Sequence, residues 1–255
     1  MRLAFIHRGS ATAKMIMQET GIPRWGRRVR ADLLINYGVA GDKFTDWQRR
    51  NPYGRQLPML NKPISLNKYE VIKKVSDQFD AALNVPVPET RKRLERIHAP
   101  EGWLWKPFYS QGGQGIEIAT DRHAPWNKYF QEYIHNRVYE LRIHAFKWIP
   151  QDEWAVQKRV SEDAEAITWN HHTGGTFVTV NDRSQRVFQD AIKHSSQVLY
   201  ELSMQFGGVD FIVDSNREVY FIEINSAVGC HGLSDPIYVD AFERLKGMDI
   251  REVVG

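Results

Sequence analysis

Two apolar runs near the end of the chain contain acidic side chains where a buried strand would have valine or isoleucine. The segment from Gly208 to Gly229 reads GVDFIVDSNREVYFIEINSAVG, in which the runs FIV and VYFI are separated by the polar stretch SNRE. Short apolar runs on either side of a polar stretch predict an antiparallel β-hairpin. Such a hairpin restricts the fold strongly, because carboxylates inside a strand need a partner that neutralises them.

The predicted register places two of the acids opposite each other. Side chains alternate between the two faces of a strand, so Glu223 and Asn225 share a face with Phe221. Counting back across the loop pairs Ile212 with Phe221 and Asp210 with Glu223. Two carboxylates at directly opposed positions lie about 5 Å apart at Cβ and repel each other.

A divalent cation is the simplest group that could neutralise this pair. Mg²⁺ accepts one or two carboxylates, retains waters and completes its octahedron with substrate phosphates. The predicted metal ligands are Asp210, Glu223 and Asn225. On this interpretation Glu223→Gln should stabilise the metal-free protein, because it removes one of two like charges. A solvent-facing hairpin whose acids simply face water is the alternative.

Length and composition are those of a globular protein. The chain has 255 residues, enough for one large domain or two small ones, and 42% of them are hydrophobic. No apolar run approaches the ~18 residues that suggest a membrane span. The start, MRLAFIHRGSATA, has an apolar centre too short for a signal peptide, so it is read as a first strand. One cysteine, Cys230, excludes an internal disulfide framework and fits a reducing cytoplasm.

Positive charge is concentrated at the start of the chain. The net charge is only +3, but residues 1–55 hold eleven Lys or Arg and four Asp or Glu, and the densest part is RWGRRVR, from Arg24 to Arg30. A basic patch attracts nucleic acid, acidic protein or anionic small molecules. A solvated basic face explains the charge equally well.

The hydrophobic pattern predicts a small α/β unit followed by an α+β part with antiparallel sheets. Residues 1–8 and 31–38 look like strands around a helix-length stretch, and residues 42–62 look like loop and linker. A helix begins after Asn67, where Glu70 completes a variant capping box. The other predicted elements are strands at 102–108, 128–134, 139–146, 153–160 and 174–180, one more strand just after the glycine-rich turn at 109–115, a helix at 187–206 that Gly207 ends, and a last helix at 234–247.

A lysine in an apolar strand precedes a glycine-rich turn. Lys106 stands in GWLWKPF, and SQGGQG follows with Gly112, Gly113 and Gly115. Glycines let backbone N–H groups approach a phosphate, and a nearby ammonium adds positive charge. The spacing is that of neither a P-loop nor a Rossmann fingerprint, and a plain hairpin turn is the alternative.

Two further strands carry polar groups at regular positions. QEYI, from Gln131 to Ile134, ends one strand, and its backbone groups could bind an adenine edge while Tyr133 and Ile134 cover the ring. An ordinary edge strand is the alternative. Glu140 and Arg142 share a face of the next strand, where they could form a surface ion pair.

Taken in order, these segments resemble the ATP-grasp superfamily of carboxylate–amine ligases. The resemblance spans roughly residues 62–235, and its most specific part is the final hairpin, where an aspartate precedes Glu-x-Asn at the family's spacing. The sub-pattern is similar to that of the glutamate ligases that modify a ribosomal protein and of the carrier-protein ligases of lysine biosynthesis. Those enzymes have a basic pair, an asparagine and two glycines, as Lys158, Arg159, Asn170, Gly174 and Gly175 are here.

The resemblance implies an ATP-grasp fold, in which two α+β subdomains clamp ATP, after a small α/β domain. The implied domains are residues 1–62, on the substrate side, and 63–255, with a subdomain break near residue 131. The implied site roles are Asp210, Glu223 and Asn225 for one or two Mg²⁺; Lys68, Lys106, Gly112, Gly113 and Gly115 for the ATP phosphates; Gln131, Glu132, Tyr133 and Ile134 for adenine; Glu140 for ribose; and Arg142, Lys158, Arg159 and Asn170 for the transferred phosphate and the acyl phosphate.

The implied reaction is ATP-dependent ligation of a carboxylate to an amine through an acyl phosphate, with amino acids or peptides as substrates. The alternatives are an ATP-grasp phosphotransferase and a basic nucleic-acid- or protein-binding module with a vestigial nucleotide site. Thr168 and Thr173 stand where the glutamate ligases have arginines, and Val228 where a proline is common, so both substrates stay open. We expect Arg24–Arg30 to lie near the mouth of the ATP cleft and to bind an anionic substrate or acidic protein.

Overall fold

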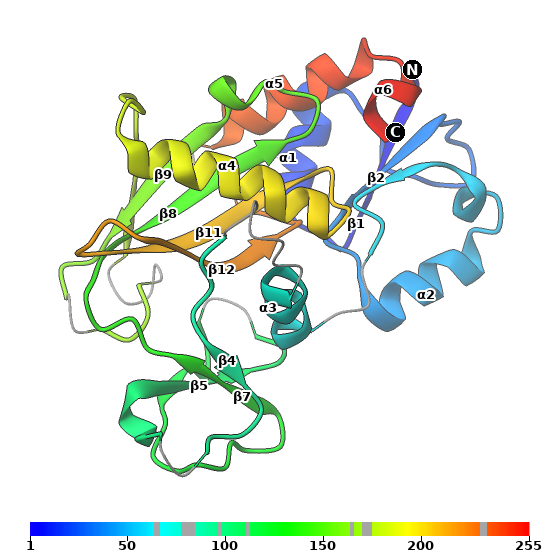
Figure 1. Cartoon of the computed structure of the whole chain (residues 1–255). Helices are drawn as coiled ribbons and strands as arrows, with labels where there is room; N and C mark the ends of the chain where they lie inside the picture. Colours follow the sequence, from blue (N-terminus) through cyan, green and yellow to red (C-terminus); the bar gives the residue numbers. More distant parts are fainter. Residues whose placement is uncertain are drawn as a thin grey trace.

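The computed structural model describes residues 1–63, 67–77, 85–95, 98–110, 113–163, 166–169, 175–229 and 234–254. Gly112, Asn170, Gly174 and Cys230, which the sequence analysis singled out, lie outside these ranges. The described residues form three sheets and the helices that cover them (Figure 1). A parallel sheet at the start and two antiparallel sheets after it confirm the predicted α+β class.

The first sheet is parallel and is buried on both faces. Its strands lie in the order β1 (Leu3–His7), β2 (Leu33–Tyr37) and β3 (Met59–Leu60). α1 (Ala11–Thr20) packs on the face that carries Phe5, and α2 (Gly41–Arg50) packs on the face that carries Ile6. Alternation of apolar side chains between the two faces therefore gives each helix its own contact surface.

The prediction of loop and linker over residues 42–62 is wrong. This stretch forms α2, a 3₁₀ turn at Gly54–Gln56 and β3. α2 is polar on most sides, but it buries Phe44 and stacks Trp47 on it with ring centroids 5.7 Å apart. Two aromatic side chains on one helix face hold the short helix on the sheet, and the polar residues around them hid this pattern in the sequence.

The largest sheet is antiparallel, with five strands in the order β10-β9-β8-β11-β12. α4 (Arg186–Glu201) lies across one face and buries its apolar stripe against β8, β11 and β12 (Figure 1). The opposite face of the sheet carries the polar side chains of the candidate site. The strand bounds are Arg137–Phe146 for β8, Ala155–Val160 for β9, Thr176–Thr179 for β10, Phe206–Asp214 for β11 and Val219–Asn225 for β12.

A four-stranded antiparallel sheet, in the order β4-β7-β5-β6, has its own small apolar cluster around Trp103 and Phe130. α3 (Lys68–Asp77) lies between this sheet and the five-stranded sheet (Figure 1). α3 contacts both β4 and β12, so it links the two antiparallel units. The strand bounds are Thr90–Arg91 for β4, Trp103–Pro107 for β5, Glu117–Ile118 for β6 and Lys128–Glu132 for β7.

The helix predicted over residues 187–206 ends earlier, at Glu201. Ser203 then adopts a left-handed backbone with φ of 52°, which turns the chain into β11. Gly207, predicted to end the helix, lies inside β11 instead. A Cβ at Gly207 would lie 3.1 Å from both the Asn225 carbonyl oxygen and the Ile224 side chain. The glycine therefore permits close packing of β11 against β12, a contact that the local pattern does not reveal.

Two helices end the described chain. α5 (Asp235–Lys246), the predicted last helix, packs against α1 (Figure 1). α6 (Ile250–Val254) follows it and was not predicted. Within the described ranges, each helix is too short or too polar to cross a membrane.

Candidate active site

The acidic hairpin forms, but its register differs from the predicted one. Asp210 lies opposite Glu223, as expected. A β-bulge follows, so that Phe221 lies opposite Phe211 rather than Ile212. The bulge leaves Phe221 fully buried in the core while Glu223 lines the candidate site. The predicted common face for Phe221 and Glu223 is therefore wrong, because one inserted residue reverses the alternation of a strand.

Cationic side chains of the protein neutralise both carboxylates. Arg142 donates from Nε and Nη2 to the two oxygens of Asp210, at 2.6 and 2.7 Å. Lys68 donates from Nζ to Glu223 at 2.7 Å. Asn225 Nδ2 bridges the pair, at 3.4 Å from Asp210 and 3.1 Å from Glu223. The sequence predicted the acids but not these partners, because Lys68 is 155 residues away from Glu223 and Arg142 lies on the neighbouring strand β8.

Lys68 can reach Glu223 because Lys68 is the first residue of α3. Asn67 Oδ1 accepts a hydrogen bond from the Glu70 N–H at 3.0 Å, and the Glu70 carboxylate accepts one from the Asn67 N–H at 2.9 Å. This reciprocal pair is the predicted capping box. The cap confirms Lys68 as the first residue of the helix and fixes where its side chain leaves the backbone.

The surroundings of Glu223 keep it ionised. Burial disfavours its charge, but Lys68, Asn225 and Lys106 outweigh that effect and hold the pKa of Glu223 at about 2. A carboxylate with this pKa is fully charged at neutral pH. It is therefore a suitable oxygen ligand for a hard cation such as Mg²⁺.

Lys106 is buried on β5, next to Gln131 on β7. Its Nζ donates to Gln131 Oε1 at 2.7 Å, and it lines the same cavity as Glu223. Burial lowers the pKa of Lys106 to about 8, and Glu223 opposes that shift. A lysine held in an apolar strand, with a neutral amide as its hydrogen-bond partner, is arranged to meet an anion from the cavity.

A second buried group surrounds Glu140. Arg137 Nη1 donates to one carboxylate oxygen at 3.1 Å, and Arg159 Nη1 donates to the other at 2.7 Å. Burial raises the pKa of the Glu140 carboxyl, and the two arginines oppose that shift. The predicted surface ion pair of Glu140 with Arg142 is wrong. Both side chains are largely buried with other partners, because β8 lies in the middle of the sheet.

The structure separates the predicted basic pair. Arg159 lines the cavity and stacks on Phe177, with its guanidinium carbon 4.2 Å from the ring centre. Lys158 lies over Tyr139 on the other face of β9, with Nζ 4.2 Å from the ring centre. Adjacent residues of a strand point to opposite faces, so both could not face the site. Arg159 therefore lines the cavity, and Lys158 does not.

One cavity of about 920 Å³ joins these groups and has walls from both antiparallel sheets. The predicted site residues that line it are Lys68, Lys106, Gly113, Gln131, Glu132, Tyr133, Ile134, Glu140, Arg142, Arg159, Asp210, Glu223 and Asn225. Gly115 is described but is not part of its wall, and neither is Lys158. Its volume falls in the range of small-molecule and cofactor sites, roughly 300–1,000 Å³.

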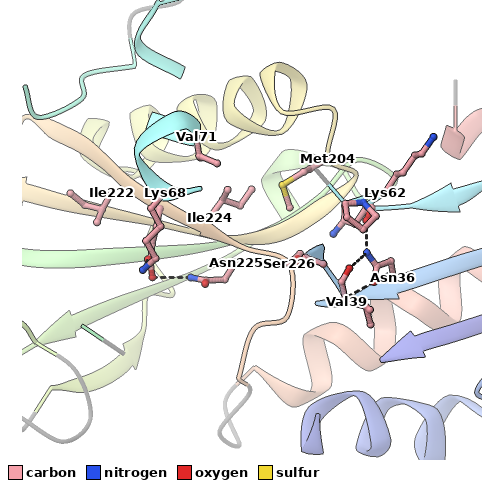
Figure 2. Close-up of a pocket in the computed structure, with 14 residues that line it drawn as sticks. Asn36, Val39, Lys62, Lys68, Val71, Met204, Ile222, Ile224, Asn225 and Ser226 are labelled. Atoms are coloured by element: carbon pink, nitrogen blue, oxygen red, sulfur yellow. Dashed lines mark hydrogen bonds and ion pairs between the residues drawn. The ribbon is translucent and has the colours of Figure 1, made fainter. Parts of the chain in front are cut away.

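A smaller cavity of about 180 Å³ meets the acidic group from the side of the first sheet. Figure 2 shows Lys68 and Asn225 at one end of it and Asn36 and Val39, at the carboxyl end of β2, at the other. Its wall shares Lys68, Glu223 and Asn225 with the larger cavity. The acidic group is therefore reachable from two sides. The apolar part of the wall is formed by Val39, Val71, Met204, Ile222 and Ile224.

The basic segment from Arg24 to Arg30 lies along the outer edge of the first sheet. The Trp25 N–H donates to the Phe5 carbonyl at 2.8 Å, which places the segment beside β1. Its four arginines are exposed, and they line neither of the two cavities described above. The expectation that this segment lies near the mouth of the nucleotide cleft therefore stays a prediction.

Cavity-lining residues that the sequence analysis missed include Arg137, Trp169 and Phe177. Arg137 is three positions from Glu140, and regular alternation would place the two on opposite faces. The pairing of β8 with β11 is irregular at Arg137, and the two side chains meet. Trp169 stands in a segment without regular structure, where no periodicity can assign its direction.

Comparisons with known proteins found a matching family model and solved structures of similar fold. A family model described as an ATP-grasp domain matches residues 66–229, more than half of the chain. A search of curated proteins gave no significant match.

Solved structures with the same fold include three peptide-bound ligases. The ATP-grasp ligase PsnB, complexed with a minimal precursor, Mg and ADP, has a TM-score of 0.59 and 13% identity over 96% of this chain and 98% of that chain. The macrocyclase MdnC from Microcystis aeruginosa MRC, bound with the precursor peptide MdnA, has a TM-score of 0.58 and 13% identity over 96% and 98%. A Chryseobacterium gregarium RiPP-associated ATP-grasp ligase, in complex with ADP and a leader and core peptide, has a TM-score of 0.60 and 13% identity over 98% of both chains.

Proposed function

Because the chain belongs to the ATP-grasp family, whose cofactors are ATP and Mg²⁺, we propose that it is a ligase that joins a carboxylate to an amine through an acyl phosphate. The observation that carries the proposal is the group at the end of the acidic hairpin. There Asp210, Glu223 and Asn225 meet the cations Lys68 and Arg142 on the wall of the large cavity.

The residues present fit a magnesium site. Asp210 and Glu223 offer carboxylate oxygens, Asn225 offers an amide oxygen, and the low pKa of Glu223 keeps that group charged. Within the described residues no group of three or more His, Cys, Asp or Glu side chains could hold a metal ion, and the set proposed here consists of two carboxylates and one amide. Bound Mg²⁺ would neutralise charge on the ATP phosphates.

The chain's own cations would complete the phosphate site. Lys68 and Arg142 neutralise Glu223 and Asp210 in this structure, and both would be available for phosphate oxygens if Glu223 and Asp210 held Mg²⁺. Lys106 is held by a neutral amide and keeps its charge for an anion. Positive charge around the transferred phosphoryl group stabilises the charge spread over its oxygens in the transition state.

The reaction proceeds in two balanced steps. A carboxylate oxygen of the substrate attacks the γ-phosphorus, the bond to the ADP oxygen breaks, and an acyl phosphate forms. The amine then attacks the acyl carbon, phosphate leaves with the oxygen that came from the carboxylate, and the proton that the amine loses passes to the departing phosphate. Water competes with the amine, so the cavity must exclude it. Arg142 and Arg159, and Asn170 outside the described residues, are the side chains that we assign to the acyl phosphate.

The adenine and ribose roles are proposed from the same wall. Gln131 to Ile134 line the cavity at the end of β7, and Glu140 lines it on β8. We assign adenine to the first group and the ribose hydroxyls to the Glu140 carboxylate. Gly113, which also lines the cavity, would face the phosphates together with Lys106.

A peptide is the substrate class that we favour. PsnB, MdnC and the Chryseobacterium gregarium ligase were each solved with a precursor or a leader and core peptide. The smaller cavity supports a substrate other than ATP, because it reaches Glu223 and Asn225 from the side of the first sheet. We assign residues 1–62 to the substrate side and 63–255 to the ATP-grasp domain, with the subdomain break near 131.

ADP release tests the proposal. The purified protein is given Mg²⁺ and ATP with panels of amino acids, carboxylic acids and acidic peptides, and the products are identified by mass spectrometry. ADP together with a new amide supports the ligase. ADP with a phosphoester would make the protein a phosphotransferase. No turnover, together with binding of a macromolecule, would make it a binding module.

A further inference from the structure

Arg137 contacts two parts of the candidate site that are far apart in the chain. Its Nη1 donates to Glu140 at 3.1 Å and to the Ile167 carbonyl at 3.3 Å, and its Nη2 donates to the Ala166 carbonyl. Its guanidinium carbon lies 4.1 Å from the centre of the Trp169 ring. One side chain therefore joins β8 to residues 166–169, which follow β9.

These contacts lie inside the protein. The Arg137 side chain is 5% exposed and Trp169 is 3% exposed, and both residues line the large cavity. Hydrogen bonds from a charged donor are stronger than neutral ones, and low solvent exposure preserves that strength. The planar guanidinium holds five N–H donors in a fixed fork and can lie flat on an aromatic ring, whereas a lysine ammonium is a compact group with three N–H donors.

The Glu140 carboxylate can accept hydrogen bonds from both arginines and from a ligand at the same time. Each of its oxygens accepts a hydrogen bond from one arginine, and each retains a second lone pair. Its position therefore depends on Arg137 and Arg159 together. The Arg159 guanidinium stacks on Phe177. The Arg137 guanidinium stacks on Trp169 and donates hydrogen bonds to two backbone carbonyls.

We infer that Arg137 is a positioning residue that holds Glu140 and residues 166–169 in a single arrangement for nucleotide binding. The inference rests on the proposed function, in which Glu140 binds the ribose. Loss of Arg137 would leave Glu140 with one partner and would release Trp169 from the cavity wall. Nucleotide affinity and the order of residues 166–169 thus depend on the same side chain.

The test compares the wild type with Arg137→Met and Arg137→Lys. Hydrogen–deuterium exchange is measured for peptides covering residues 166–169, and the Kd for MgADP is measured by calorimetry. Arg137→Met should speed exchange in 166–169 and weaken MgADP binding about 10- to 100-fold, the range found when residues that orient metal-binding side chains are removed. Arg137→Lys keeps a charge beside Glu140 but not the fork, so part of the affinity should return while exchange stays fast.

Arg183→Met is the matched control. Arg183 also donates to a backbone carbonyl, that of Trp154, but it lines neither cavity, so its loss should leave both readouts unchanged. Arg137→Met with either wild-type exchange in 166–169 or a wild-type Kd for MgADP overturns the inference. If the wild type itself does not bind MgADP, the proposed function fails. The exchange rates of residues 166–169 in the ligand-free wild type and variant then show separately whether Arg137 orders that segment. If Arg137→Met does not fold, Arg137→Lys serves, and unchanged exchange in that variant also overturns the inference.

Discussion

At the scale of single residues, the candidate site is a set of charges that the protein has already paired. Asp210 and Glu223 are each held by a cation, and Asn225 connects them. This arrangement reverses the expected effect of removing one acid. Two unpaired carboxylates would repel each other, but a carboxylate that neutralises a lysine stabilises the fold.

Glu223→Gln should therefore abolish turnover and also destabilise the ligand-free protein. The variant loses a metal ligand and leaves the Lys68 ammonium without its anion, at a cost of about 1–3 kcal/mol. The folded pKa of Glu223, about 2, lies below its ordinary value of 4.5, so the stability it contributes is present above pH 4.5 and is lost as the pH falls toward 2. Thermal unfolding in EDTA at pH 7 and at pH 3 measures this difference between wild type and variant. A Tm at pH 7 above that of the wild type would show that repulsion dominates after all.

Lys106 should make nucleotide binding sensitive to alkaline pH. Its pKa is about 8, so the ammonium is present below pH 8 and is lost above it, and the affinity for MgADP should fall as the pH rises through that value. A bound phosphate favours the charged form, so binding near pH 8 should take up a proton. Calorimetry in buffers of different ionisation enthalpy measures that uptake.

Lys106→Met should weaken MgADP binding about 10- to 100-fold at pH 7, because a charge-assisted hydrogen bond contributes about 1.5–3 kcal/mol. It should also remove the proton uptake. Lys128→Met is the control, since Lys128 lies on the adjacent strand, pairs with Glu117 and does not line the cavity. Equal losses of MgADP affinity in the two variants would show that Lys106 does not bind the phosphates.

At the scale of elements, a helix cap and a β-bulge direct the charged side chains toward the cavity. The capping box at the start of α3 places Lys68, and the bulge in β12 turns Glu223 toward the cavity while Phe221 stays in the core. A bulge is a means by which a strand re-aims a side chain beside a site. The two features come from different units and meet at one ion pair.

Asn67→Ala should lower stability and also weaken nucleotide binding. Removing a helix cap costs about 1 kcal/mol, and here the first residue of the freed helix turn is Lys68. Ser10→Ala is the matched variant, since Ser10 caps α1 by accepting a hydrogen bond from the Ala13 N–H. Chemical denaturation should show similar losses for both variants, and MgADP titration should show a several-fold rise in Kd for Asn67→Ala alone. A similar rise for Ser10→Ala would mean that lost stability, not Lys68, weakens binding.

Local patterns in the sequence predicted most of the elements, and together with the family resemblance they singled out most of the charged residues that line the large cavity. The acidic hairpin, the capping box and Lys106 depend on alternation and spacing within a few residues, which a sequence shows directly. The pairing of Lys68 with Glu223 and of Arg137 with Glu140 depends on how distant elements meet and on strand irregularities. α2 was missed because its contact with the sheet rests on only two aromatic residues.

At the scale of the whole molecule, the first sheet is attached by hydrogen bonds to the segment just after β12 and to the start of β11. Tyr37 Oη donates to the Val228 carbonyl at 2.8 Å, and Asn61 holds the start of β11 through the backbone of Gln205 and Phe206. These hydrogen bonds place the first sheet beside β11 and the segment after β12. The role of the exposed arginines beside β1 stays a prediction.

Changing Arg27, Arg28 and Arg30 together to Gln should raise the KM for the acidic substrate and leave the Kd for MgADP unchanged. Exposed cations raise the capture rate of an acidic partner, and salt screens the effect. Steady-state kinetics at low and at high salt should show the difference between wild type and variant shrinking with salt. Normal kinetics combined with lost nucleic-acid binding would assign the segment to a different partner.

If a carboxylate of the substrate attacks ATP, one oxygen atom of the released phosphate must come from that carboxylate. Acidic peptides are labelled with ¹⁸O in their carboxyl groups by acid-catalysed exchange and are incubated with the enzyme, Mg²⁺, unlabelled ATP and an amine. Mass spectrometry of the products should show ADP, a new amide and phosphate that carries one ¹⁸O atom. Unlabelled phosphate, or release of AMP and pyrophosphate, would contradict the proposed acyl phosphate.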